Sequence, residues 1–261
     1  MLSKDDKREL RGTLFQHLDG IVTAPTVVAL RDHGVLDFID NAGTVDVDRL
    51  ATKFNANAGY LNVALRILAS QGWLVQSIDK DGNHVAYSCA ETFSKVRELS
   101  HLYDAAVGVM KLSAKYHPRK FEREPFLKME AAVSLLDTDC RSSSDAAGDT
   151  GRVRSQMLKH VEGLLLGPTV VHLGMSGMFH KYFMDASFRP DEFHEDAESF
   201  ARLLRILASR GWFAETNDTF QFTEKGLFYA RRASAYGVTV SYLPTLQNLD
   251  QLIFGDPDYL R

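Results

Sequence analysis

The sequence predicts a mainly α-helical protein with small β-ribbons, in which one structural unit occurs twice. The block Leu65–Trp73 returns 139 residues later as Leu204–Trp212, with eight of nine positions identical. Pro25–Val28 returns 143 residues later as Pro168–Val171. Both copies carry apolar residues at helical spacing, followed by a short strand–turn–strand pattern.

Two matched blocks in the same order indicate a duplicated unit, and the two offsets imply that the second copy has lost four residues between them. The period is too long for a solenoid, and 261 residues suffice for two ordinary domains. We therefore expect repeats at 1–97 and 153–232 and a helical connector at 98–152, with a mobile loop at 138–149. A C-terminal helical segment is expected at 233–261.

In the first repeat, residues 12–40 carry a long apolar helical pattern that Gly34 interrupts. Pro25 is expected to kink or restart this helix, because proline suits a first turn and not a helix interior. Asp46 follows, and it is predicted to cap the N-terminus of a helix over Val47–Phe54.

The next predicted helix runs from about Tyr60 to Gln71, and its buried face consists of Leu61, Ala64, Leu65 and Leu68. Gly72 is predicted to end it in the left-handed conformation. Trp73–Ile78 and His84–Ser88 are predicted strands, joined by a hairpin turn at Asp81-Gly82. Three helices followed by a two-stranded ribbon is the order of a winged helix.

The second repeat reproduces this order, with a buried face formed by Phe200, Leu203, Leu204 and Leu207. Gly211 is predicted to end the helix, Asn217-Asp218 to form the hairpin turn, and Thr219–Phe222 to be the return strand. Thr223 is a predicted N-cap. The four missing residues fall near Ser187–Pro190, so the middle helix of this copy is expected to be abbreviated.

These patterns predict tandem duplicated winged-helix-like domains joined by a helical segment. Trp73 and Trp212 are expected to anchor each ribbon on its helices. Residues 96–137 are expected to be helical with a break at His117-Pro118, and residues 235–254 form a further helical stretch.

The composition limits the function classes. The net charge of -4 and the pI near 6.1 argue against a dedicated nucleic-acid binder. Cys89 and Cys140 match neither a disulfide framework nor a zinc site, so a reducing, cytoplasmic compartment is expected. The N-terminus has no signal-peptide pattern and no apolar run is long enough to span a bilayer, so no membrane partner is expected.

DNA binding requires basic or amide side chains on the last helix of each winged helix. The candidates are Asn62, Arg66 and Gln71 in the first copy and Arg202, Arg205 and Arg210 in the second. Both ribbon tips, at 79–81 and 215–218, are net acidic, which opposes contact with phosphates. Nucleic acid is therefore not an expected partner, and a winged-helix transcription regulator or protein-interaction module is the alternative interpretation.

Other chemical motifs are weak. Gly174–Gly177 is the nearest match to a cofactor-binding glycine loop, but it aligns with the helix break at Gly34 and follows no strand. His172, His180 and His194 match no known ligand spacing. We therefore expect no catalytic residue, cofactor-binding residue or metal ligand in this chain.

Thr26–Ile39, the helix over 60–71 with Gly72-Trp73, and the ribbon after it resemble the N-terminal region of class I S-adenosylmethionine-dependent methyltransferases. O-methyltransferases of that class use a related unit for dimerisation. The doubled arrangement, Val240–Leu246 and the step at Phe254-Gly255 resemble, more narrowly, polyketide-synthase-associated methyltransferases of the apratoxin and saxitoxin loading-module type. In that family the doubled region is a lid that helps to enclose an acyl group on an acyl carrier protein.

The resemblance implies a catalytic core after Phe254-Gly255, whereas the sequence ends at Arg261. We therefore expect a non-catalytic lid whose methyltransferase core, with its S-adenosylmethionine, is missing from this chain or forms a separate chain. Within 241–251, apolar and polar residues alternate, and Tyr242 and Gln247 are predicted to face the substrate. The alternative for Tyr242 is packing in the final helix.

Overall fold

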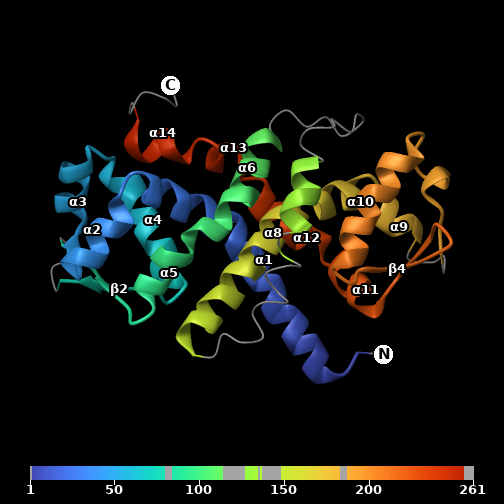
Figure 1. The fold of residues 1–261 in the computed structure, drawn as a ribbon, viewed down its shortest axis with the longest axis horizontal. Coiled ribbons are helices and arrows are strands. Elements are labelled where there is room, and N and C mark those ends of the chain that lie inside the picture. The colour runs from blue at the N-terminus through green and yellow to red at the C-terminus, as the bar shows by residue number, and fades with distance from the viewer. Residues whose placement is uncertain are drawn as a thin grey trace.

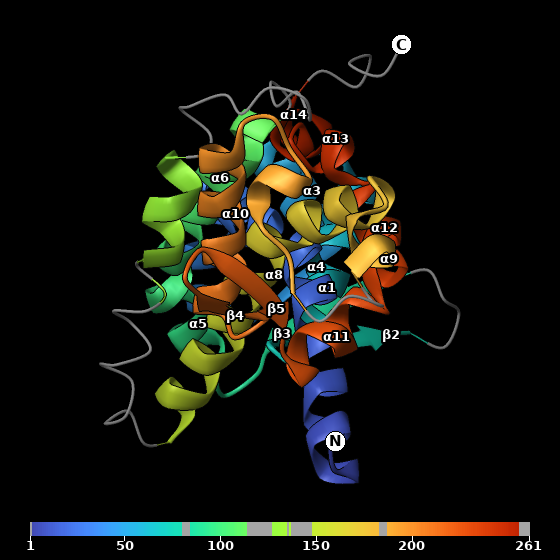
Figure 2. The same ribbon diagram turned by 90° about the vertical axis from the view of Figure 1, so that its right-hand side faces the viewer.

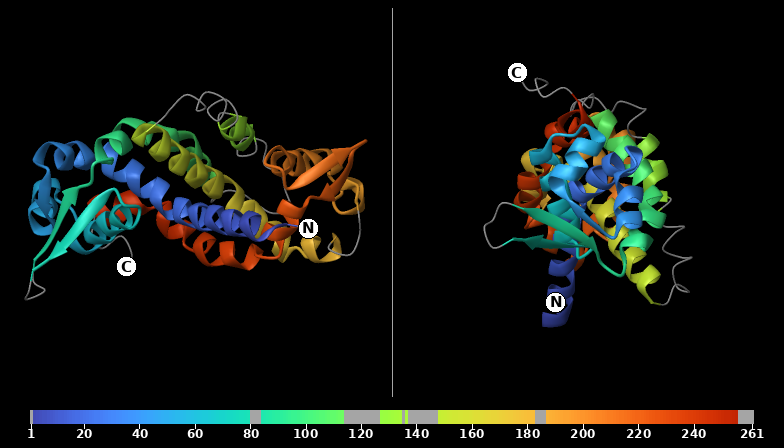
Figure 3. Two further views of the ribbon diagram at one scale, coloured as in Figure 1. Left: turned by 90° about the horizontal axis from the view of Figure 1, so that it is seen from below. Right: turned by 90° about the vertical axis from the view of Figure 1, so that its left-hand side faces the viewer.

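The computed structural model describes residues 2–79, 84–113, 127–134, 136, 148–182 and 187–255. In these residues the chain is mainly helical with two small antiparallel sheets, which confirms the predicted fold class. Two long helices, α1 (Lys4–Asp32) and α8 (Asp149–Met175), cross near the middle of the molecule. The first repeat lies at one end of this pair and the second at the other (Figures 1 and 3).

The first repeat contains one strand more than the sequence predicts. After α1 come α2 (Val35–Ala42), β1 (Thr44–Asp46), α3 (Val47–Phe54), α4 (Ala58–Ser70), β2 (Leu74–Ile78) and β3 (Val85–Cys89). The sheet order is β1-β3-β2, with every neighbouring pair antiparallel. Because β1 is only three residues long and runs directly into α3, it offers no alternating pattern to recognise.

The predicted helix ends of the first repeat are confirmed. The Asp46 carboxylate accepts hydrogen bonds from the backbone N–H groups of Asp48 and Arg49, at 2.9 and 3.1 Å, and so caps α3. Gly72 has a φ of +75°, the left-handed conformation expected after α4. The hairpin turn predicted at Asp81-Gly82 lies outside the described residues.

The second repeat is abbreviated, as predicted. Its elements are α9 (Met178–Tyr182), η3 (Pro190–Glu192), α10 (Ala197–Ser209), β4 (Phe213–Thr216), β5 (Thr219–Phe222) and α11 (Glu224–Ala230). A single 3-10 turn, η3, replaces the eight-residue α3. An isolated bridge between Phe188 and Phe220 replaces β1. Figure 2 shows the β4–β5 ribbon beside α11 at this end of the molecule.

The caps of the second repeat match those of the first. Gly211 has a φ of +75° after α10. Asn217 and Asp218 have φ values of +51° and +57°, as required in a two-residue hairpin of the predicted kind. The Thr223 side chain accepts a hydrogen bond from the backbone N–H of Gly226, so Thr223 caps α11.

Helices also surround the two repeats. The connector contains α5 (Phe93–Leu99), η1 (Ser100–Tyr103), α6 (Asp104–Ser113) and a helical segment at 127–134. Its predicted break at His117-Pro118 and residues 138–147 of the predicted loop lie outside the described residues. Asp149 was expected in that loop, but it begins α8.

Pro25 was predicted to kink or restart its helix, and of these alternatives the restart was wrong. α1 runs unbroken through Pro25, and α8 runs unbroken through the equivalent Pro168. Every side chain from Thr23 to Leu30 is buried, so packing on both sides of the proline outweighs the loss of one backbone hydrogen bond.

At the crossing of α1 and α8, equivalent residues of the two sequence repeats make equivalent contacts. A Cβ at Gly20 would overlap the backbone of His160, and a Cβ at Gly163 would overlap the backbone of His17. His17 and His160 are 143 positions apart, and so are Gly20 and Gly163, which is the same separation as that of the two proline blocks. The two long helices therefore touch backbone to backbone, and one continuous hydrophobic core joins the repeats. Trp73 and Trp212 are fully buried in it, as predicted.

A C-terminal strap, defined here as residues 233–254, follows the second repeat. It consists of α12 (Ala233–Val240), α13 (Leu243–Leu246) and α14 (Leu249–Phe254). α12 packs on α8, and α13 and α14 then lie over the first repeat (Figure 1). The backbone N–H of Asn57 donates to the Ile253 carbonyl at 2.7 Å, and the His33 ring stacks on Phe254 with 3.8 Å between centroids.

Candidate functional site

The arginines of α10, where a DNA-binding winged helix reads bases, all form ion pairs within the chain. The pairs are Arg202–Glu130 (2.8 Å), Arg205–Glu215 (2.8 Å), Arg205–Asp218 (2.9 Å) and Arg210–Glu162 (3.4 Å). Two of the carboxylates belong to the β4–β5 ribbon, which is the part that would approach phosphates. This face therefore carries little net positive charge.

The polar residues of α4 also make contacts inside the molecule. The Tyr87 hydroxyl donates to the Asn62 side-chain oxygen at 2.7 Å, and this bond holds β3 on α4. Gln71 accepts from the Gln156 amide at 3.1 Å, and Gln156 in turn accepts from the Trp73 indole N–H at 3.1 Å. Two of the three candidate base-reading residues of this helix thus join it to the ribbon and to α8.

The two predicted substrate-facing residues lie at opposite ends of α13. Tyr242 precedes its first turn and Gln247 follows its last. The Gln247 amide donates to the Met110 carbonyl of α6 at 2.8 Å, so this side chain anchors the strap to the connector. The Tyr242 side chain, in contrast, is 58% exposed. Packing in the final helix does not account for Tyr242 in the described residues.

A second apolar residue of the strap is also exposed. Val238 lies four positions before Tyr242, on α12, and is 67% exposed. Val238 and Tyr242 are thus a pair of exposed apolar residues on the strap, whereas Leu243, Leu246 and Leu252 of the strap are buried.

A second cluster of chemically active groups is buried at the crossing of α1 and α8. The His17 Nδ1 lies 2.8 Å from the Tyr236 hydroxyl, and the His160 Nδ1 lies 2.7 Å from the Tyr103 hydroxyl. The two contacts are crosswise between the repeats. His17 of the first repeat contacts Tyr236, which follows the second repeat, and His160 of the second repeat contacts Tyr103, which follows the first. All four side chains are fully buried.

One carboxylate lies beside this cluster. Glu162 Oε1 is 3.8 Å from His17 Nε2, and its other oxygen faces Arg210. Burial alone would raise the pKa of Glu162, but the interaction with His17 and the charge of Arg210 outweigh burial, so the pKa lies well below its usual range. Burial, with the charge of His17, lowers the pKa of His160 to about 3. Burial raises the pKa of Tyr103 well above its usual range.

The internal repeat extends upstream to the two histidines of this cluster, but not to their tyrosine partners. At the offset of 143 residues, His17, Asp19 and Gly20 match His160, Glu162 and Gly163. This match begins eight residues before Pro25 and consists of only three positions. It is therefore much less conspicuous than the longer repeated blocks. The cluster binds the two halves together, and its depth in the core separates it from any soluble reactant.

The glycine motif has the structural role that was expected of it. Gly174–Gly177 forms the end of α8, and Gly177 has a φ of +79°, matching +73° at Gly34. Burial and the charge of His194 lower the pKa of His172. Within the described ranges, no three histidine, cysteine or carboxylate side chains are placed to hold a metal ion. No described helix has the length and hydropathy needed to cross a membrane.

Comparison with known protein families relates both halves of the chain to one protein. Residues 10–76 match the family described as the AprA N-terminal domain, and residues 162–256 match the AprA winged helix domain. No curated protein matches the chain. The first range covers α1 to β2, and the second covers most of α8, the second repeat and the C-terminal strap. In both ranges, therefore, the chain is similar to an AprA-like protein, and it contains a winged helix domain.

Proposed function

We propose that this chain is the non-catalytic cover of an S-adenosylmethionine-dependent methyltransferase and closes over an acyl group held by an acyl carrier protein. The methyltransferase core, in the same chain or a separate one, supplies the cofactor site. The observation that carries the proposal is the exposed Val238–Tyr242 pair on the C-terminal strap. A cover needs apolar side chains that stay outside its own core, because closure must exclude water from the reacting group.

Two further observations support this proposal over DNA binding. The arginines of α10 are neutralised by carboxylates, as described above. The strap also packs on α8 and returns to the first repeat, where His33 lies 2.7 Å from Asp250, so both ends of the segment that carries Val238 and Tyr242 are attached to the fold. A rigid unit orders a partner surface at a smaller entropic cost than a loose segment does.

The proposal is tested by measuring methyl transfer to a carrier-bound acyl group by the core, with and without this chain. We expect the chain to raise the rate, and Tyr242→Ala to reduce that effect by about tenfold, as for loss of one well-packed aromatic contact. Phe15→Ala is the matched control, because Phe15 on α1 is also an aromatic side chain and is also 58% exposed.

Two results would contradict the proposal. One is micromolar binding of S-adenosylmethionine to this chain alone, which would give it a cofactor site of its own. The other is retardation of duplex DNA in a low-salt gel shift that weakens steeply with added salt, which would favour a nucleic-acid binder.

A further inference from the structure

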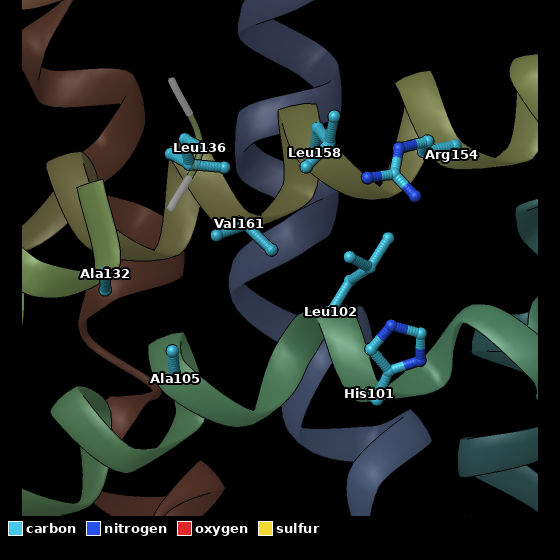
Figure 4. Close-up of a pocket in the computed structure, with 8 residues that line it drawn as sticks. All are labelled: His101, Leu102, Ala105, Ala132, Leu136, Arg154, Leu158 and Val161. Carbon is cyan, nitrogen blue, oxygen red and sulfur yellow. The ribbon is translucent and has the colours of Figure 1, made fainter. Parts of the chain in front are cut away.

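A pocket of about 220 Å³ lies between α8, the connector helices η1 and α6, and the helical segment that contains Ala132 and Leu136 (Figure 4). It is separate from the Val238–Tyr242 pair and from the buried histidine–tyrosine cluster. Its size is below the roughly 300–1,000 Å³ of sites for drug-sized ligands, so it suits a small molecule.

The pocket has a basic end and an apolar end. Arg154 and His101 lie at one end, and in Figure 4 their side chains approach the same part of the cavity from α8 and η1. Leu102 and Leu158 lie in the middle. Leu136 lies at the far end and is 3% exposed.

The helical spacing produces this polarity. On α8, Arg154, Leu158 and Val161 stand at i, i+4 and i+7, so one stripe of the helix changes from basic to apolar along the cavity. On the opposite wall, His101 and Ala105 stand at i and i+4 and follow the same direction. The two basic groups therefore meet at one end of the pocket.

The basic groups have donors for an anion. A guanidinium carries five N–H donors, so Arg154 can hold a ligand oxygen beside the interaction it already makes in the chain. The His101 Nδ1 lies 3.0 Å from the Glu98 carbonyl and donates its proton there, so Nε2 can donate to a ligand oxygen only in the imidazolium form of the ring.

We propose that this pocket binds a short aliphatic carboxylate, with its carboxyl group at Arg154 and His101 and its chain along Leu102, Leu158 and Val161. A chain of about four to eight carbons fits a cavity of this size. The site is distinct from the proposed cover surface and does not depend on it.

The test uses the full chain with labelled leucine and valine methyl groups and hexanoate as the probe, followed by NMR. Binding is expected to shift the methyl signals of Leu158 and Val161. Arg154→Gln is expected to weaken hexanoate at least about tenfold, the effect of losing a charge-assisted bond. Arg152→Gln is the matched control and is expected to have no effect, because Arg152 is 70% exposed and pairs with Asp149.

Two further experiments test separately the need for the ligand's charge and the location of the binding site. Hexanol, which lacks the charge, is expected to bind at least about tenfold more weakly than hexanoate. Ala105→Phe places a ring in the pocket from an exposed position on α6, so it is expected to abolish binding without lowering the melting temperature. The proposal is overturned if the Leu158 and Val161 methyls do not respond to hexanoate, or if Arg154→Gln and Arg152→Gln behave alike.

Discussion

At the scale of single residues, His160 makes the stability of the protein depend on pH. Its pKa is about 3 in the folded chain, because burial and the charge of His17 oppose protonation, against an ordinary value of 6.5. Between these values only the unfolded chain binds the proton, so protonation favours unfolding. As the pH falls below 6.5, the free energy of unfolding is expected to drop by about 1.4 kcal/mol per pH unit from this residue.

Urea unfolding between pH 7.5 and 5.0 measures this effect. His160→Gln keeps a hydrogen-bonding group for Tyr103 but removes the titration, so its stability should fall less steeply with acid than that of the wild type. Equal slopes for wild type and His160→Gln would show that His160 is protonated in the folded chain.

Residues with local roles were predictable from the sequence, and residues with long-range roles were not. Asp46, Gly72 and Thr223 act on backbone groups within three positions of themselves, and local patterns identify such residues. His17 acquires its role only from Tyr236, which lies 219 positions away in the chain. Composition and spacing contain no information about such a partner until the two long helices are known to cross.

At the scale of elements, the contact between α1 and α8 depends on two glycines. Gly20→Ala places a methyl group against the His160 backbone, and Gly163→Ala does the same at His17. Backbone cannot move aside as a flexible side chain can, so each substitution is expected to lower the free energy of unfolding by at least about 2 kcal/mol. Thermal melting followed by circular dichroism measures the loss.

The same helix supplies a control for this prediction. Gly12 lies on α1 with open space where a Cβ would stand. Gly12→Ala is therefore expected to raise the melting temperature slightly, through the better helix propensity of alanine. If Gly20→Ala were as stable as Gly12→Ala, the close approach of the two helices would be wrong.

Helices and strands were predictable from the sequence where their own apolar periodicity determines their type and position. The α4 and α10 faces and the ribbons after them follow from spacing and capping. The continuity of α1 through Pro25 does not, because it depends on burial by other elements. The same holds for the route of the strap: its helical character was predicted, but its return to the first repeat depends on contacts such as Asn57 with Ile253.

At the scale of the whole molecule, the duplicated unit forms one structure with a shared centre. The crosswise bonds His17–Tyr236 and His160–Tyr103 each join parts of the chain that belong to different repeats. The hydrophobic core runs without interruption from one repeat to the other. If the chain acts as the proposed cover, this shared core predicts that closure over a partner involves motion at its edge and not between the repeats.

This arrangement predicts that the two repeats unfold together. Each long helix has buried faces that only the other half covers, so neither half retains a complete core when the other unfolds. Calorimetry of the full chain should show one transition with equal calorimetric and van't Hoff enthalpies. Gly20→Ala should move that whole transition to lower temperature, since a defect at the crossing is shared by both repeats. Two resolved transitions, only one of them shifted by Gly20→Ala, would mean that the repeats are independent domains.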